Sequence, residues 1–599
     1  MCHRAGALVI ACLATLALSS VASAGPVKVE LHGGADGWEL LRDGKPYRIK
    51  GAGGNASKQL LARCGGNSLR TWGVDAGTQA LLDEAAQLGL TVALGIWLGH
   101  ERHGFDYGDE RRVKQQLETA RRAVERYKDH PALLMWGIGN EMEGRDGDNP
   151  AAYRAVQEIA MMVRRLDPDH PTMTAIAEIG GPKVANVHQY CPDIDILGIN
   201  TYAGAASIPE RYREAGGTKP YVATEFGPPG PWEVGRNELD TIDEPSSSEK
   251  AEWYRRAYLA FEADRQLCLG SYAFMWGSKQ EATPTWFGMF LPDGARTRVV
   301  DTMAELWSGR APADLSPSIE RLSIDRNDNL KPGDTVKATL AASDPEGDPL
   351  TVEWRLCLHA GGHVTGGDLQ NAPLSFREAV VRSDAESAEI KIPGSGGLYR
   401  LFAFVHDGKG GGAVANVPLR VEGPEITLPP PPGRKVGLPL VVGGDGGTAP
   451  FAPSGWMGNS VAVTMDAACE IEPHGGKTCL QFTYGEPDGW AGVVWQDPPD
   501  DWGEKPGGYY LVGATKLTFW ARGQDAGENV NFGFGLLGRD KRYYDTGQAE
   551  INVTLAKEWQ QYTIDLTGKD LSRIKSGFYW SLAGQGKPVT FYLDDIRYE

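Results

Sequence analysis

Two glutamates stand at the ends of apolar segments of the kind that forms buried strands. Glu141 closes the run Leu-Met-Trp-Gly-Ile-Gly-Asn-Glu at residues 134–141, and Glu225 lies within Val-Ala-Thr-Glu-Phe-Gly at residues 222–227. A charge in such a place is costly unless it has a partner or a chemical role. Two carboxylates that face one site can act as a general acid/base and a nucleophile, which is the pair that glycoside hydrolysis requires. We therefore predict that Glu141 is an acid/base and Glu225 a nucleophile.

Both glutamates belong to a regular alternation of strand and helix patterns within residues 25–311. Short β-rich segments predict strands at residues 47–51, 68–72, 91–98, 133–140, 172–177, 194–202, 221–226 and 270–276. Apolar residues at helical spacing predict helices at residues 78–88, 111–127, 151–166, 248–264 and 299–307. This order predicts a (β/α)₈ TIM barrel, capped at its bottom by a hairpin within residues 27–48. A doubly wound sheet is disfavoured because no G-x-G-x-x-G follows the first strand. The C-terminal strand ends of a barrel share one face, so Glu141 and Glu225 are expected to meet there.

The motifs around the two glutamates resemble those of a known clan of enzymes. G-N-E at residues 139–141 and T-E-F-G at residues 224–227 are similar to the acid/base and nucleophile motifs of retaining (β/α)₈ glycosidases. This clan includes the catalytic domain of glycoside hydrolase family 2 and the fungal-type β-1,3-glucanosyltransferases. The resemblance covers about residues 50–307.

The resemblance also implies roles for four further residues. Asn140 would bind the 2-hydroxyl of the sugar, and Tyr202 would donate a hydrogen bond to the nucleophile. Trp276 would form the floor of the subsite beside the scissile bond. Arg70 would hold Glu225 ionised, because a neighbouring positive charge favours the carboxylate. The alternatives are a plain barrel ion pair for Arg70 and a core position for Tyr202.

Several other residues could contact a substrate. Trp97, His188, Trp232 and Trp286 are predicted to line the sugar site, with packing or surface positions as the alternative. Glu143 and Glu178, which also lie near strand ends, are alternatives to Glu141.

The sequence gives no metal or cofactor pattern. His100 and His103 lie in a charged loop, and the cysteines form no C-x-x-C pair. We therefore expect neither a metal nor a cofactor.

The N-terminus and the charge constrain location and partners. Residues 1–24 have the pattern of a secretory signal peptide, with an apolar run at residues 5–18 and Ala-Ser-Ala at residues 22–24. A loose lipoprotein box at residues 9–12 is an alternative. No other long apolar segment occurs, so a secreted or periplasmic protein without a membrane span is expected. The net charge of −18 and the lack of a basic run exclude the electrostatic footprint of a nucleic-acid partner. The sequence does not indicate an oligomeric state.

Two β domains are predicted after the barrel. Residues 316–422 have the pattern of an immunoglobulin- or cadherin-like sandwich, and residues 423–450 form a Pro/Gly-rich linker. Residues 451–599 are rich in aromatics and resemble jelly-roll carbohydrate-binding modules of the galactose-binding-like type, through residues 516–523 and 589–598. For Asp344, Glu346 and Asp348 the sequence leaves open a calcium site or a solvated turn. For Cys469 and Cys479 it leaves open a disulfide or two free thiols.

Together these features predict a secreted retaining β-glycoside hydrolase, or a transglycosylase, whose partner is a β-linked poly- or oligosaccharide. A β-glucan is favoured because the barrel precedes the β domains, as it does in the glucanosyltransferases. Complete family 2 enzymes carry such domains before their barrel. A non-catalytic carbohydrate-binding protein and a cell-surface scaffold are the alternatives.

Overall fold

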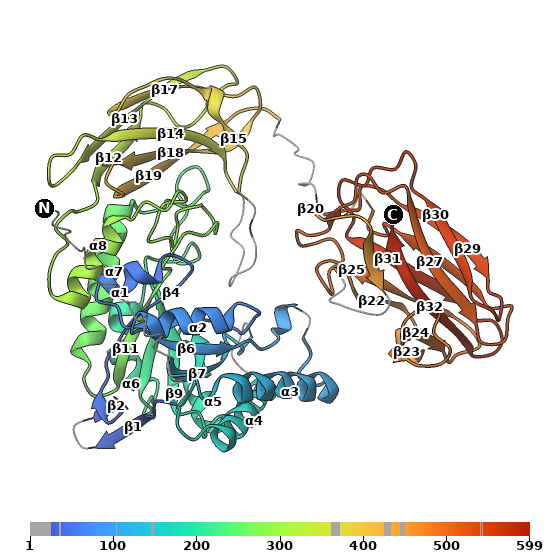
Figure 1. Cartoon of the computed structure of the whole chain (residues 1–599). Coiled ribbons are helices and arrows are strands. Elements are labelled where there is room, and N and C mark those ends of the chain that lie inside the picture. Colours follow the sequence, from blue (N-terminus) through green and yellow to red (C-terminus); the bar gives the residue numbers. More distant parts are fainter. Residues whose placement is uncertain are drawn as a thin grey trace, which may run out of the picture. The chain divides into compact units, whose positions relative to one another are not determined.

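The computed structural model describes residues 26–599 except 35–36, 104, 145–148, 361–369, 371, 425–432, 444–449, 539–540 and 542. The predicted signal peptide at residues 1–24 and half of the predicted linker at residues 423–450 lie outside the described residues. The chain divides into two compact units. The first unit holds a barrel and a β-sandwich, and the second holds another β-sandwich (Figure 1). None of the described helices is long and apolar enough to cross a membrane.

The first unit contains a closed barrel of parallel strands surrounded by helices (Figure 1). The strands are β4 (Ile49–Gly53), β5 (Ser68–Arg70), β6 (Thr91–Ile96), β7 (Leu133–Asn140), β8 (Thr172–Ala177), β9 (Ile196–Asn200), β10 (Tyr221–Phe226) and β11 (Cys268–Phe274). The helices are α1 (Lys58–Arg63), α2 (Thr78–Gln87), α3 (Glu110–Tyr127), α4 (Pro150–Leu166), α5 (Lys183–Tyr190), α6 (Ile208–Glu214), α7 (Ser247–Ala263) and α8 (Arg298–Ser308). The predicted TIM barrel is confirmed.

Local sequence explains where the long helices begin. The side chain of Asn149 accepts the N–H of Ala151 at 3.0 Å, with Pro150 in the first turn of α4. Helix α7 begins with a capping box between Ser246 and Glu249. Helices α1, α5 and α6 were not predicted, because six to eight residues are too few to display a helical period.

A short antiparallel sheet closes the N-terminal end of the barrel. It consists of β1 (Val29–Gly34), β2 (Gly37–Arg42) and β3 (Lys45–Pro46), with Asp43 and Gly44 at positive φ in the turn between β2 and β3. Val29 and Leu40 are buried in one cluster with residues from the beginnings of the barrel strands, such as Ile49. The predicted bottom cap is therefore confirmed.

The first β-sandwich packs against the barrel within the same unit. Its two sheets are formed by β12 (Ser318–Ile324), β13 (Thr335–Ser343), β17 (Ser387–Lys391) and β16 (Val380–Ser383), and by β15 (Ser375–Phe376), β14 (Thr351–Leu358), β18 (Gly397–His406) and β19 (Gly412–Val421). Leu291 of the barrel domain packs into an apolar cluster with Phe402 and Phe404. The buried pair of Lys250 and Glu244, at 2.5 Å, receives a further hydrogen bond at 2.7 Å from Asn416 of the sandwich. The barrel therefore depends on this sandwich to cover an apolar and charged face.

The acidic turn of this sandwich is closed by its own backbone. Asp344 Oδ1 accepts the N–H groups of Glu346 and Asp348, both at 3.0 Å. Lys409 Nζ lies 2.7 Å from Asp348 Oδ2. Lys409 thus supplies the positive charge that a calcium ion would otherwise provide.

The second unit is a sandwich of two antiparallel sheets. One sheet has the order β23 (Val463–Cys469), β24 (Cys479–Tyr484), β32 (Val589–Tyr598), β27 (Lys516–Gly523) and β30 (Gln560–Asp565), with β21 (Leu440–Gly443) also paired to β32. The other has the order β22 (Ala452–Gly458), β25 (Trp490–Gln496), β31 (Ser576–Ala583), β28 (Asn529–Phe534) and β29 (Ala549–Thr554), while β20 (Arg434–Lys435) pairs with β26 (Tyr509–Tyr510). Cys469 and Cys479 oppose each other between β23 and β24, as buried free thiols. The fold of barrel followed by β-sandwiches thus matches the sequence-based expectation.

Candidate active site

Glu225, at the C-terminal end of β10, is surrounded by hydrogen-bond donors. Its Oε1 accepts from Arg70 Nη1 at 2.7 Å and from Trp72 Nε1 at 2.9 Å, and its Oε2 accepts from the Tyr202 hydroxyl at 2.8 Å. The side chains of Arg70 and Glu225 are 4% and 8% exposed, so their attraction is little screened by solvent. These donors stabilise a negative charge on Glu225 and fix the orientation of the carboxylate.

Tyr202 is suited to remain a donor. Burial and the negative charge of Glu225 raise the pKa of Tyr202 well above its ordinary value. The phenol therefore keeps its proton and remains a hydrogen-bond donor to Glu225.

Glu141 has a different environment. It follows directly on β7, and its Oε1 accepts from Asn200 Nδ2 at 2.7 Å. Burial, followed by the negative charge of Glu225, raises the pKa of Glu141 to about 7. A carboxyl group with that pKa is substantially protonated near neutral pH, as a general acid must be.

The turn that presents Glu141 depends on a glycine. Gly139 has a φ of 69°, and a Cβ added there would lie 2.6 Å from Met142 Cγ. The pairing of β7 with β8 shifts register between Gly137 and Asn140. Glu141 itself has a φ of 53°, a left-handed conformation that non-glycine residues seldom adopt. Its N–H is held by a 2.8 Å hydrogen bond to Ala175 O.

An amide network joins the two glutamates. Asn140 Oδ1 accepts from Arg70 Nη2 at 2.6 Å and from Asn200 Nδ2 at 3.1 Å. Asn200 Oδ1 accepts from Thr224 Oγ1 at 2.7 Å, which fixes the orientation of the Asn200 amide. Among the described residues Asn140 Nδ2 has no partner, so it can donate to a ligand hydroxyl. The structure therefore brings the predicted residues Arg70, Asn140, Glu141, Tyr202 and Glu225 into one site.

Two predicted tryptophans lie exposed beside this site. Trp232, in the segment after β10, is 47% exposed and meets the ring of Tyr202 edge to face at 5.6 Å. Trp97, immediately after β6, is 47% exposed and stacks on His100 with ring centroids 4.8 Å apart. Both indoles follow C-terminal strand ends and present area on which a sugar could pack.

The prediction that Trp276 forms the floor of the subsite is wrong. Its side chain is fully buried, meets Phe290 edge to face at 5.0 Å and donates from Nε1 to Ser57 O at 3.1 Å. Strand β11 ends at Phe274, two residues before the predicted end, so strand alternation does not set the direction of Trp276. The indole instead fills the core between the barrel and the outer helices.

Trp286 and His188 are also not in the site. Trp286 is fully buried and donates from Nε1 to Pro229 O at 2.9 Å, so it has no face for a sugar. His188 lies on α5, with Nε2 3.2 Å from Thr218 Oγ1. Thr218 precedes β10, so His188 lies toward the N-terminal end of the barrel, opposite the glutamates. The predictions that Trp286 and His188 line the sugar site are therefore wrong, because tertiary packing that the sequence does not show places both side chains elsewhere.

Three residues of the site were not predicted. Trp72 donates to Glu225 and its ring lies 5.1 Å from the Arg70 guanidinium carbon, whereas Asn200 donates to Glu141. The ring centroid of Phe274 lies 5.9 Å from that of Trp72 and 6.1 Å from that of Tyr202. Trp72 and Asn200 each lie two positions from a predicted site residue, but Trp72 follows the end of β5 and Tyr202 the end of β9, so strand alternation alone does not place them in the site.

The alternative glutamates are engaged elsewhere. Glu143 is buried, accepts the N–H of Ala177 at 2.5 Å and lies 3.5 Å from Lys183 Nζ. Glu178 pairs with Arg211 at 2.9 Å. Glu141 is therefore the glutamate that shares a network with Glu225.

Part of the barrel is similar to a known protein family. Residues 75–234, which hold both glutamates, match the profile of the glycosyl hydrolases family 2, TIM barrel domain. This match over part of the barrel agrees with the motif resemblance. No curated protein sequence matches the chain significantly.

Solved structures similar to this chain include two bacterial glucuronidases. The β-D-glucuronidase of Dictyoglomus thermophilum is 20% identical over 47% of this chain and 54% of that chain, with a TM-score of 0.38. The β-glucuronidase of Ruminococcus gnavus is 18% identical over 48% of this chain and 53% of that chain, also with a TM-score of 0.38. The chain therefore spans about half the length of these enzymes.

Proposed function

We propose that this protein is a retaining β-glycoside hydrolase that works by double displacement. The observation that carries the proposal is the unequal environment of two glutamates in one network. Glu225 receives hydrogen bonds from Arg70, Trp72 and Tyr202, whereas the pKa of Glu141 is raised to about 7. One carboxylate is suited to attack, and the other to give and take a proton.

The first step forms a glycosyl ester. A carboxylate has about four lone-pair positions, two on each oxygen. Both positions on Glu225 Oε1 are occupied by donors, whereas Oε2 accepts one bond, from Tyr202. Oε2 therefore attacks the anomeric carbon while the glycosidic C–O bond breaks. The proton of Glu141 passes to the departing oxygen.

The second step releases the sugar. The Glu141 carboxylate takes a proton from water, the water oxygen bonds to the anomeric carbon, and the ester bond to Glu225 breaks. Glu141 is again protonated and Glu225 is again a carboxylate. If a sugar hydroxyl replaces water, the same step is transglycosylation. Asn140 Nδ2 is placed to donate to a sugar hydroxyl, a contact that can strengthen as positive charge develops on the ring.

The substrate that we propose is a β-linked poly- or oligosaccharide, with a β-glucan as the first choice. Trp97 and Trp232, each 47% exposed, favour a chain of several sugars over a single glycoside. The signal-like residues 1–24 support action outside the cytoplasm. The two steps require no cofactor.

A product assay tests this proposal. The purified protein is incubated with β-glucans, galactans and mannans and with aryl β-glycosides, including a β-glucuronide, beside Glu225→Ala. We expect turnover that the substitution abolishes, with the β-anomer as the first product seen by NMR. Product lengths then separate endo-hydrolysis, exo-hydrolysis and transfer. A first product of inverted configuration would refute the double displacement.

The alternatives are a non-catalytic carbohydrate-binding protein and a surface scaffold. A shortened protein that ends at Pro424 distinguishes these alternatives from an enzyme, because it keeps the barrel and the first sandwich that packs on it. An enzyme retains turnover of small aryl glycosides in that chain. Binding of polysaccharide without turnover, in both the full and the shortened chain, would support a binding protein.

A further inference from the structure

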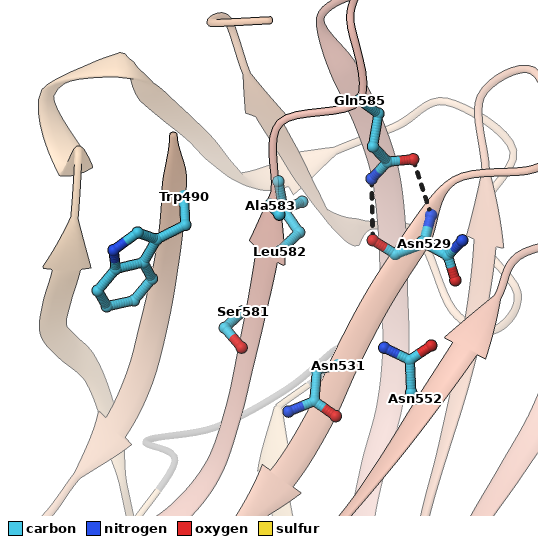
Figure 2. A pocket seen from close by; sticks show the side chains of 8 residues that line it. All are labelled: Trp490, Asn529, Asn531, Asn552, Ser581, Leu582, Ala583 and Gln585. Atoms are coloured by element: carbon cyan, nitrogen blue, oxygen red, sulfur yellow. Dashed lines mark hydrogen bonds between the residues drawn. The ribbon is translucent and has the colours of Figure 1, made fainter. Parts of the chain in front are cut away.

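The second sandwich has a pocket on its five-stranded sheet, far from the barrel in sequence. The pocket has a volume of about 280 Å³ and lies over β25, β31, β28 and β29 (Figure 2). Its lining is formed by Trp490, Asn529, Asn531, Asn552, Ser581, Leu582, Ala583 and Gln585. This volume is close to the lower end of the range of about 300–1,000 Å³ for small-molecule sites.

Strand alternation separates this lining from the core. Ala491 of β25, Phe532 of β28 and Trp580 of β31 are buried inside the sandwich. Their neighbours Trp490, Asn531 and Ser581 therefore project from the opposite face of the same sheet. The polar side chains are thus not a by-product of core packing.

Trp490 forms one wall of the pocket. Its side chain is 51% exposed although it is large and apolar. The ring is supported by Gly458, where an added Cβ would lie 2.9 Å from ring atom Cδ2. A supported, exposed indole offers a flat apolar surface at low entropic cost.

The opposite side supplies amides in fixed positions. Gln585 makes two hydrogen bonds to the backbone of Asn529, at 2.9 and 3.0 Å, which hold the rim (Figure 2). Asn531 Nδ2 donates to Glu550 at 2.9 Å, which leaves its Oδ1 available. Among the described residues, the side chains of Asn552 and Ser581 have no hydrogen-bond partner. The pocket therefore combines oriented donors and acceptors with one aromatic wall.

No charged side chain is part of the pocket lining. The neighbouring Glu550 is engaged by Tyr579 at 2.7 Å and by Asn531. A charged ligand would find no counter-ion in the lining. A neutral polyhydroxylated ring fits, because its C–H face packs on an indole and its hydroxyls pair with amides.

We infer that this pocket is a second carbohydrate site, which binds a neutral glycan chain independently of the barrel. The motif resemblance of residues 451–599 predicts a binding module without indicating a face, and the pocket identifies that face. The inference does not require the barrel to be an enzyme. It does require Trp490 and Asn552 to contact the sugar.

Affinity electrophoresis of the full chain tests the inference. Native gels contain a soluble mixed-linkage β-glucan, galactan, xylan or galactomannan, with the acidic polygalacturonate as a charged comparison. Glu225→Ala is the background, so that cleavage cannot clear the gel. Trp490→Ala and Asn552→Ala are compared with Trp502→Ala, a control at a tryptophan that is 37% exposed and outside the pocket.

We expect at least one neutral glycan to retard the protein and polygalacturonate to have no effect. Trp490→Ala should weaken that binding about tenfold or more, and Trp502→Ala should leave it unchanged. Asn552 is exposed, so Asn552→Ala should weaken binding without affecting folding. Retardation that Trp490→Ala leaves undiminished with every neutral glycan would place binding elsewhere and overturn the inference. The absence of retardation by every neutral glycan would also overturn it.

Discussion

Replacing Glu141 with glutamine should remove the alkaline limb of the pH–rate profile. The pKa of Glu141 is raised to about 7 by burial and by the charge of Glu225. A general acid is effective only while protonated, so kcat should fall about tenfold for each pH unit above 7. Glutamine keeps the shape and the acceptor for Asn200 but has no proton to give. The loss should be about 10²–10⁴-fold on substrates with a poor leaving group, and far less on activated aryl glycosides.

The same substitution should change stability in a pH-dependent way. Between its usual pKa of 4.5 and about 7, Glu141 holds a proton in the folded protein that the unfolded chain has released. The free energy of unfolding therefore falls as pH rises through this window, and the loss is complete above it. At about 1.4 kcal/mol per unit, the loss is on the order of 3 kcal/mol. Glu141→Gln should thus match the parent protein near pH 4.5 and be more stable by up to that amount at pH 8.

Two measurements check this reasoning. Values of kcat and kcat/KM are recorded from pH 4 to 9 on aryl glycosides with leaving groups of different acidity, and urea unfolding is followed at pH 5 and pH 8. Glu143→Gln and Glu178→Gln are the controls, because those carboxylates contact Ala177, Lys183 and Arg211 instead. An unchanged alkaline limb in Glu141→Gln, or its loss in Glu178→Gln, would refute the assignment.

Three further substitutions probe the residues around the glutamates. Arg70→Met leaves the buried Glu225 without its cation, so the free energy of unfolding at pH 7 should fall by about 3–5 kcal/mol in urea titrations; an unchanged free energy of unfolding would contradict the pairing. Trp72→Phe removes one charge-assisted hydrogen bond from Glu225, worth about 1.5–3 kcal/mol. It should lower kcat/KM about 10- to 100-fold and lower the free energy of unfolding by up to a similar amount of energy, and wild-type kinetics would count against a role for Trp72. Trp232→Ala should raise KM for a polysaccharide about tenfold and leave small aryl glycosides unaffected, whereas an equal effect on both would place Trp232 outside the extended substrate path.

Local sequence patterns were sufficient to locate the barrel strands and the two glutamates at their ends. Parallel strands buried on both faces are nearly continuous apolar runs, and such runs marked β7 and β10 closely. The C-terminal ends of barrel strands share one face, so the positions of Glu141 and Glu225 followed from strand order. Arg70 and Tyr202 followed from motif resemblance, and the structure places both against Glu225.

The sequence alone did not determine which aromatic side chains face the site. Trp276 and Trp286 lie beyond the end of β11, where no alternation fixes direction, and neighbouring segments enclose both rings. Phe274 and Trp72 approach Tyr202 and Glu225 from strands distant in sequence. His188 was misplaced for the same reason, because the pattern of a short helix does not show which end of the barrel its residues approach.

In the second sandwich, too, the sequence predicted the elements and only the tertiary structure showed which side chains share a site. The resemblance of this sandwich to jelly-roll modules predicted a β domain, but each strand has two faces. The pocket became visible only when Trp490, Asn531 and Asn552 were brought onto adjacent strands. Periodicity is a local property that a single segment carries, and it determined the elements of this protein. Contact between side chains depends on the pairing, register and closure of many segments, so only the tertiary structure decided which residues share a site.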